Sequence, residues 1–122
     1  MSTPVEVAVR TYVALPQEPD PAVRARMIEA CWAEDGRLVT RNGEIRGRAA
    51  IAAMFDSFIA DPRGFTVELA SVIDAKGSTF RFRARTVARD GSPVPDVFDA
   101  GMIDADGRIS LILTFAGPLP DA

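Results

Sequence analysis

Asp99 is the residue of this chain whose type and setting point most directly to chemistry. It lies inside 97–103, an otherwise uncharged run that ends at the turn-forming segment 104–107 and is typical of a buried strand. Because side chains alternate across a strand, Asp99 shares a face with Val97 and Gly101, and neither is a cation. Burial disfavours the ionised form of a carboxyl. We therefore expect Asp99 to be protonated near neutral pH and to donate a hydrogen bond, as a catalytic or ligand-binding acid does.

The composition limits the chemistry that such an acid can share in. The chain has no histidine and 1 cysteine, so imidazole bases, zinc clusters of His and Cys, and Ser/His/Asp or Cys/His catalysis are excluded. No calcium-binding EF-hand loop, phosphate-binding glycine loop or dinucleotide fingerprint is present in the sequence. We therefore expect no cofactor and no metal, and either cofactor-free catalysis or simple binding.

Length and charge set the broad class. A chain of 122 residues with 48% apolar composition suits one globular domain, which we place at 1–122. The net charge of −3 argues against a nucleic-acid or anionic-membrane surface, and the expected partner is a small apolar molecule. The N-terminal segment lacks the apolar stretch of a signal peptide, which makes the cytoplasm the expected location.

Two short helices are predicted near the N-terminus from their start signals. Thr3 and Asp20 each precede a proline, and a capping side chain followed by proline is typical of a helix start. We expect the first helix to end by Pro16. The second carries its apolar stripe toward Trp32 until the dipeptide 35–36 stops it.

A hairpin and a third helix are predicted next. The segments 38–40 and 44–46 flank an Asn-Gly pair, which supplies the positive φ angles of a tight turn. From Gly47 onward, large apolar residues recur at helical spacing until Pro62 breaks the pattern. These residues are Ile51, Met54, Phe55, Phe58 and Ile59.

The remainder of the chain predicts four strands in an antiparallel arrangement. They span 65–74, 79–88, 95–103 and 108–116, with glycine turns between them. If Lys76 and Gly77 form the first turn, Glu68 lies opposite Arg85 and Val72 lies opposite Arg81. Helices first and a curved sheet second predict an α+β domain with a pocket between the layers.

Short motifs in this order of elements resemble the NTF2-like superfamily. The motifs are VRTYV at 9–13, CWAEDG at 31–36, IRGRAAI at 45–51 and DADGRI at 104–109. They are similar to the SnoaL-like and ketosteroid-isomerase-like branches. The resemblance implies a cystatin-like cone, with three N-terminal helices packed on a curved antiparallel sheet, usually as a dimer.

The same resemblance implies roles for individual residues. Tyr12 matches the helix-borne tyrosine of the ketosteroid isomerases, and Asp99 matches their strand-borne acid; together these two donate hydrogen bonds to the substrate oxygen. The family's general base falls on Thr40, whose hydroxyl cannot abstract a carbon-bound proton at neutral pH. Glu44 on the paired strand is an alternative base.

The expected pocket has an apolar wall around these groups. Beyond Tyr12 and Asp99, the residues expected to line it are Trp32, Phe55, Phe58, Phe82, Val97, Gly101 and Phe115.

Three kinds of function remain open on this basis. The leading one is a cofactor-free enzyme, an isomerase, cyclase or hydrolase, acting on a small apolar carbonyl, enol or epoxide compound. The second is a ligand-binding protein that lacks a base, and the third is a partner-binding domain with a filled core.

A homodimer through the outer sheet face is also expected. Arg81, Arg83 and Arg85 alternate with apolar residues along one strand and form a basic stripe on that face. The facing strand brings Glu68 and Val72 between them. This mixture is apolar enough to be buried and charged enough to set the register of two copies.

Overall fold

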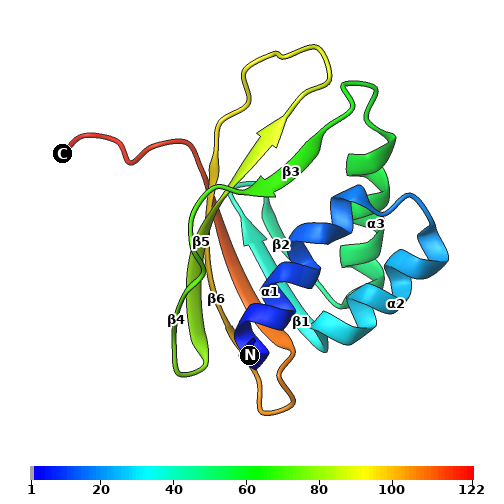
Figure 1. The fold of residues 1–122 in the computed structure, drawn as a ribbon, viewed down its shortest axis with the longest axis vertical. Helices are drawn as coiled ribbons and strands as arrows, with labels where there is room; N and C mark the ends of the chain where they lie inside the picture. Colours follow the sequence, from blue (N-terminus) through cyan, green and yellow to red (C-terminus); the bar gives the residue numbers. More distant parts are fainter. Residues whose placement is uncertain (1) are drawn as a thin grey trace.

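Three helices cover one face of a curved sheet in the computed structural model, which describes residues 2–122 (Figure 1). The helices are α1 (Pro4–Ala14), α2 (Pro21–Cys31) and α3 (Arg48–Ala60), with a short 3-10 turn, η1 (Leu15–Gln17), after α1. The strands are β1 (Trp32–Thr40), β2 (Gly43–Arg46), β3 (Thr66–Leu69), β4 (Asp74–Lys76), β5 (Thr79–Val87), β6 (Val97–Ile103) and β7 (Ile109–Ala116). The fold is α+β, as expected.

The two predicted helix starts are confirmed. The hydroxyl of Thr3 accepts a hydrogen bond from the backbone N–H of Glu6 at 3.2 Å, and the carboxylate of Asp20 accepts one from Ala22 at 2.9 Å. Each bond satisfies an amide that has no partner inside its helix. The helix α1 also ends before Pro16, as predicted.

The end of α2 differs from the prediction, because β1 already begins at Trp32. Trp32 has extended backbone angles, φ −109° and ψ 137°, and pairs with Ile109 of β7. Gly36, interpreted as a helix stop, lies instead at an irregularity of β1. A Cβ there would come 2.6 Å from the Trp32 ring, so glycine is required by close packing. Pairing with a distant strand thus overrides the local stop signal.

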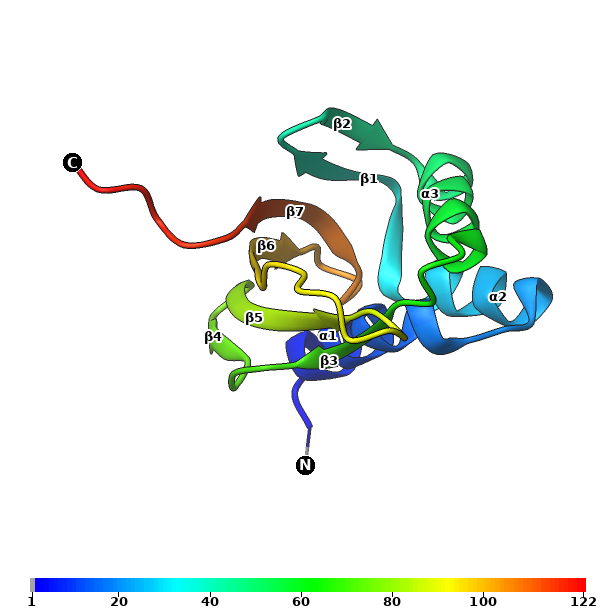
Figure 2. The same cartoon turned by 90° about the horizontal axis from the view of Figure 1, so that it is seen from above.

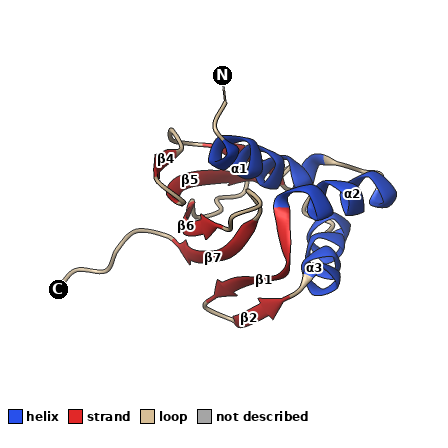
Figure 3. Ribbon diagram, turned by 90° about the horizontal axis from the view of Figure 1, so that it is seen from below, coloured by secondary structure: helices blue, strands red, loops and turns tan. Residues whose placement is uncertain are grey.

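The strands form one seven-stranded sheet in the order β2-β1-β7-β6-β5-β3, with β4 also paired to β5. All pairs are antiparallel except β1 with β7, which is parallel. The sheet curves around the helices without closing into a barrel, and β1 and β2 turn toward α3 (Figures 2 and 3). This curvature gives the sheet a concave inner face and a convex outer face.

The predicted strand at 65–74 is two strands, β3 and β4, with an interruption between them. Glu68 lies opposite Arg85 as predicted, but Asp74 and not Val72 lies opposite Arg81. The turn after β4 is one residue later than predicted, since Lys76 pairs with Thr79. The interruption shifts the register back, so the pairing of β3 with β5 agrees with the prediction although the pairing of β4 with β5 does not.

The hairpin between β1 and β2 is present, with Thr40 opposite Gly43. The positive φ angle falls on Gly43 alone, at 125°, whereas Asn42 has an ordinary negative φ. The Asn-Gly pair therefore marked the hairpin correctly but not its turn geometry.

Candidate active site between the helices and the sheet

A pocket with a cavity of about 180 Å³ lies between the helices and the inner face of the sheet. Among the described residues, its polar lining consists of Tyr12, Thr40, Thr86, Asp99 and Thr114. The apolar lining includes four residues of the expected wall, Phe55, Phe58, Phe82 and Val97, together with Val13, Pro16, Leu38, Met54, Val67 and Ala84. The pocket is thus mostly apolar with a few polar groups, which is the usual composition of a small-molecule site.

Asp99 is buried on the inner face, in the middle of β6. It lies between Phe82 of β5 and Thr114 of β7, which face it across the two strand pairs. Its side chain is only 3% exposed, and Oδ1 has no hydrogen-bond partner among the described residues. A buried carboxyl oxygen without a partner is costly, so this atom is available to a ligand.

Burial raises the pKa of Asp99 to about 6, while a hydrogen bond from the Thr114 hydroxyl works in the opposite direction. No ion pair to Asp99 is found within residues 2–122. The pKa of Asp99 is raised as expected, but a value of about 6 leaves most of the carboxyl ionised at pH 7, so the prediction that Asp99 is protonated near neutral pH is not confirmed. A carboxyl with this pKa can both give and accept a proton close to neutral pH.

Tyr12 reaches the same pocket from α1. Its ring packs edge-on against Trp32 at 5.6 Å and against Phe55 at 5.9 Å between ring centroids. Burial, and secondly the nearby Asp99 carboxylate, raise the pKa of Tyr12 well above its ordinary value of 10.0. The phenol therefore stays protonated and is a hydrogen-bond donor throughout the neutral range.

Comparisons with known proteins agree with this architecture. The model of the SnoaL-like domain matches residues 9–112. The chain belongs to the SnoaL-like family. A steroid Δ-isomerase from Nocardioides simplex is 33% identical over 120 residues, which cover 97% of this chain and 94% of that protein.

Two crystal structures share the fold over nearly the whole chain. A SnoaL-like family protein from Agrobacterium tumefaciens superposes with a TM-score of 0.85 and 28% identity, covering 96% of this chain and 100% of that one. A protein with a cystatin-like fold from Methylobium petroleophilum superposes with a TM-score of 0.77 and 23% identity, covering 98% and 78%. The NTF2-like resemblance is therefore confirmed.

Thr40 occupies the pocket at the end of β1, but its side chain has a structural partner. Its Oγ1 accepts a hydrogen bond from the backbone N–H of Asn42 at 3.1 Å, which stabilises the hairpin turn. Glu44, the alternative base, is exposed and lies 3.0 Å from an Arg37 guanidinium nitrogen, and it does not line the pocket. Among the lining residues described, Asp99 is therefore the only carboxyl in this SnoaL-like site.

Trp32 and Gly101 were predicted in the pocket wall, and the structure contradicts both. Trp32 is fully buried against the Tyr12 ring, and its Nε1 has no hydrogen-bond partner among the described residues. Gly101 is covered by the Phe80 ring, which would lie 2.8 Å from a Cβ at this position. Neither residue lines the pocket: Trp32 belongs to the hydrophobic core, and Gly101 is half-buried.

Phe115 was also predicted in the pocket wall, and it lies instead on the outer face with 60% of its surface exposed. The alternation along β7 explains this, since Thr114 beside it faces Asp99 on the inner face. Sequence reasoning missed Thr114. Taking Asp106 and Gly107 as the centre of the last turn would have placed Thr114 opposite Asp99.

Residues 2–122 contain no group of three or more His, Cys, Asp and Glu side chains that could hold a metal ion. None of the helices in the described part of the chain has the length and apolar character needed to cross a membrane.

Proposed function

We propose that this SnoaL-like protein is a cofactor-independent enzyme of the isomerase or cyclase type, acting on a small apolar carbonyl, enol or epoxide compound. The observation that carries the proposal is the buried, unpartnered Oδ1 of Asp99, in a pocket that also holds the Tyr12 phenol. Both groups donate to one substrate oxygen when Asp99 is protonated, and they stabilise the negative charge that develops there. The steroid Δ-isomerase relative supports this reaction class.

Because Asp99 is the only carboxyl among the described lining residues, we assign all proton transfers of the reaction to it. For a β,γ-unsaturated ketone, protonated Asp99 gives its proton to the carbonyl oxygen, and the resulting carboxylate removes a proton from the α-carbon to leave a dienol. Asp99 then delivers this proton to the γ-carbon and takes the proton back from the oxygen, which regenerates the acid and releases the conjugated ketone. Isomerisation and cyclisation have no net proton change, so one group with a pKa of about 6 serves both steps. Tyr12 remains protonated and holds the substrate oxygen throughout.

A direct test uses two β,γ-unsaturated ketones, 3-cyclohexenone and 5-androstene-3,17-dione, whose isomerisation creates a conjugated enone with a new ultraviolet absorbance. The proposal expects turnover of at least one of them above the buffer rate, and loss of this turnover in Asp99→Ala. Absence of turnover, together with phenol binding that does not depend on Asp99, overturns it.

A binding protein without turnover is the second candidate, and Thr40 favours it. The position where the family places its general base carries a hydroxyl that already accepts a backbone hydrogen bond. Tight phenol binding that depends on Asp99 and Tyr12, without turnover of either ketone, would support this function over catalysis.

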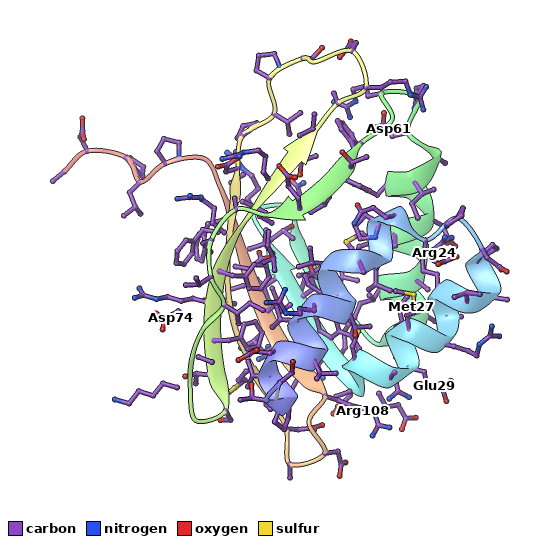
Figure 4. The ribbon with its side chains drawn as sticks, in the orientation of Figure 1. Arg24, Met27, Glu29, Asp61, Asp74 and Arg108 are labelled. Atoms are coloured by element: carbon purple, nitrogen blue, oxygen red, sulfur yellow. The ribbon has the colours of Figure 1, made fainter. Side chains whose placement is uncertain are left out.

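We propose further that two copies of the chain associate through the outer face of the sheet. Phe98 and Phe115 are 41% and 60% exposed there, and Leu119 lines the same surface hollow. Asp74 lies on this side of the sheet, away from the helices (Figure 4), and its carboxylate is 2.7 Å from Arg81. Pairing within the chain reduces the net charge of the arginine stripe, so the face is apolar enough to be covered. Sedimentation at micromolar concentration tests this, and a single species near 13.1 kDa contradicts it.

A further inference from the structure

The size and polar pattern of the pocket identify a substrate class. We infer that the site takes an uncharged one-ring compound with two oxygen functions on non-adjacent ring carbons. The inference rests on the proposed function, because it assigns the first oxygen to Tyr12 and Asp99. It departs from the four-ring substrate that the name of the Nocardioides relative implies for that protein.

The volume sets the upper limit. A cavity of about 180 Å³ is slightly larger than the roughly 150 Å³ that accommodates benzene in a protein core. It is below the lower limit of about 300 Å³ for pockets that enclose drug-sized molecules. One six-membered ring with small substituents matches this space, whereas a four-ring skeleton would have to leave most of its surface outside.

The walls around the cavity are part of the hydrophobic core and therefore resist widening. Leu38 and Phe82 are each 2% exposed, and Phe55 of α3 is 5% exposed. Phe55 also holds Tyr12 through their edge-on contact. Because interiors are packed as densely as crystals, moving these side chains apart would disrupt the packing of α3 on the sheet.

The charge of the lining excludes anionic substrates. Asp99 is the only charged residue among the described residues that line the pocket. A substrate carboxylate or phosphate would therefore meet a carboxyl without a cation to compensate it. An uncharged compound carries no such penalty, and it also favours the protonated form of Asp99.

A row of three polar side chains crosses the floor of the pocket. Thr114 faces Asp99 across the β6–β7 pair. In the parallel pair of β1 and β7, Val39 lies beside Leu113, which places Thr40 beside Thr114. The row therefore runs Thr40–Thr114–Asp99 over three neighbouring strands.

This row can bind a second ligand oxygen. The Thr40 oxygen already accepts a hydrogen bond from Asn42, but its hydroxyl proton is free to donate. Two strand spacings separate the backbones of Thr40 and Asp99 by about 10 Å, and we take the same spacing for their side-chain oxygens, which rise from one face of the sheet. Subtracting a hydrogen bond of about 2.8 Å at each end leaves roughly 4 to 5 Å, the separation of oxygens on non-adjacent carbons of a six-membered ring.

Four neutral phenols test size and polar pattern separately. They are phenol, resorcinol with its second hydroxyl in the meta position, 2-naphthol, and the four-ring phenol 17β-estradiol. Binding is measured by calorimetry at pH 6. We expect resorcinol to bind about three- to tenfold more tightly than phenol, the effect of one added neutral hydrogen bond. Estradiol should bind at least tenfold more weakly than phenol.

Three threonine variants locate the second oxygen. Thr40→Val should remove the advantage of resorcinol over phenol, and Thr40→Ser, which keeps the hydroxyl, should retain it even if the hairpin turn is perturbed. Thr66→Val is the matched control. Thr66 is exposed on β3 beside Val67, whose side chain lines the pocket, so this variant should bind all four phenols as the wild type does.

The outcomes separate this inference from the function on which it rests. If estradiol binds as tightly as phenol, or if resorcinol has no advantage, the substrate class is wrong although binding still depends on Asp99. If resorcinol keeps its advantage in Thr40→Val, the second oxygen is not at Thr40. If Asp99→Ala and Tyr12→Phe bind every phenol as the wild type does, the proposed function itself fails.

Discussion

The two faces of the β6–β7 hairpin invert the usual distribution of polar and apolar side chains. On the inner face, Asp99 and Thr114 are opposite each other and Asp99 is buried; on the outer face, Phe98 and Phe115 are opposite each other and exposed. Neighbouring residues of the same two strands thus carry a buried acid and a pair of exposed aromatic rings. Each arrangement is costly for an isolated chain, so each points to something that binds there.

The difference between the faces lies in what each is expected to bind. The inner face has a small cavity and a carboxyl oxygen without a partner, which suit a small polar atom on an apolar ligand. The outer face has a wide apolar surface bordered by arginines that are paired within the chain. It suits a second copy of the protein. Substitutions on one face should therefore leave the function of the other unchanged.

The largest expected effect is on turnover after truncation of the buried acid. Asp99→Ala should lower kcat of the best ketone substrate by at least about 10²- to 10³-fold, because the variant loses a donor to the developing oxyanion and also the carboxyl that transfers the protons. Asp99→Asn keeps a donor of similar size and should bind phenol almost normally. Steady-state kinetics measures kcat, and calorimetry measures phenol binding. Equal kcat values for Asp99→Ala and wild type would show that Asp99 on the inner face takes no part in the reaction.

The second effect is on stability and has a defined pH window. The pKa of Asp99 is raised from 3.8 to about 6, so the folded state binds the proton more tightly than the unfolded state. The free energy of unfolding should therefore fall as pH rises from about 4 to about 6, by about 3 kcal/mol relative to Asp99→Asn, and stay level above this range. Urea unfolding at several pH values tests this. A wild-type protein that loses stability relative to Asp99→Asn as the pH falls from about 6 to about 4 would contradict this prediction.

The third effect concerns association through the outer face. Phe115→Asp places a charge in the proposed interface and should weaken the dimer at least tenfold, while phenol binding in the pocket remains at the wild-type level. Sedimentation equilibrium and calorimetry on the same sample measure both properties. A loss of phenol binding would show that the two faces are not independent.

The smallest effect is expected from the exposed ion pairs of the outer face. Arg81 and Asp74 are 2.7 Å apart, and both side chains are more than half exposed. Arg81→Ala should change the free energy of unfolding by less than about 1 kcal/mol, because water screens such pairs. Thermal unfolding of the isolated variant at a concentration below the dimer range provides the measurement.

Local signals in the sequence predicted much of this fold. The capping residues Thr3 and Asp20 act within one turn of their own position, and the structure confirms both helix starts. The uncharged setting of Asp99 likewise predicted its burial. In these places the physical cause lies within a few residues, so the sequence contains it.

Other features depend on contacts between distant parts of the chain, and prediction failed there. Trp32 begins a strand because it pairs with Ile109, and no local pattern indicates that partner. Phe115 was placed in the pocket because aromatic residues favour interiors, but the register with Phe98 puts it outside. The size of the pocket is equally non-local, since α1, η1, α3 and five strands contribute side chains to its wall.

The most direct test of the central claim is a titration of the Asp99 carboxyl carbon by NMR, with and without phenol. We expect a pKa of about 6 in the free protein, and a higher value with phenol bound, because the neutral acid then shares the ligand oxygen with Tyr12. Tyr12→Phe should reduce the increase that phenol causes. A pKa near the ordinary 3.8 that phenol does not change would contradict the account.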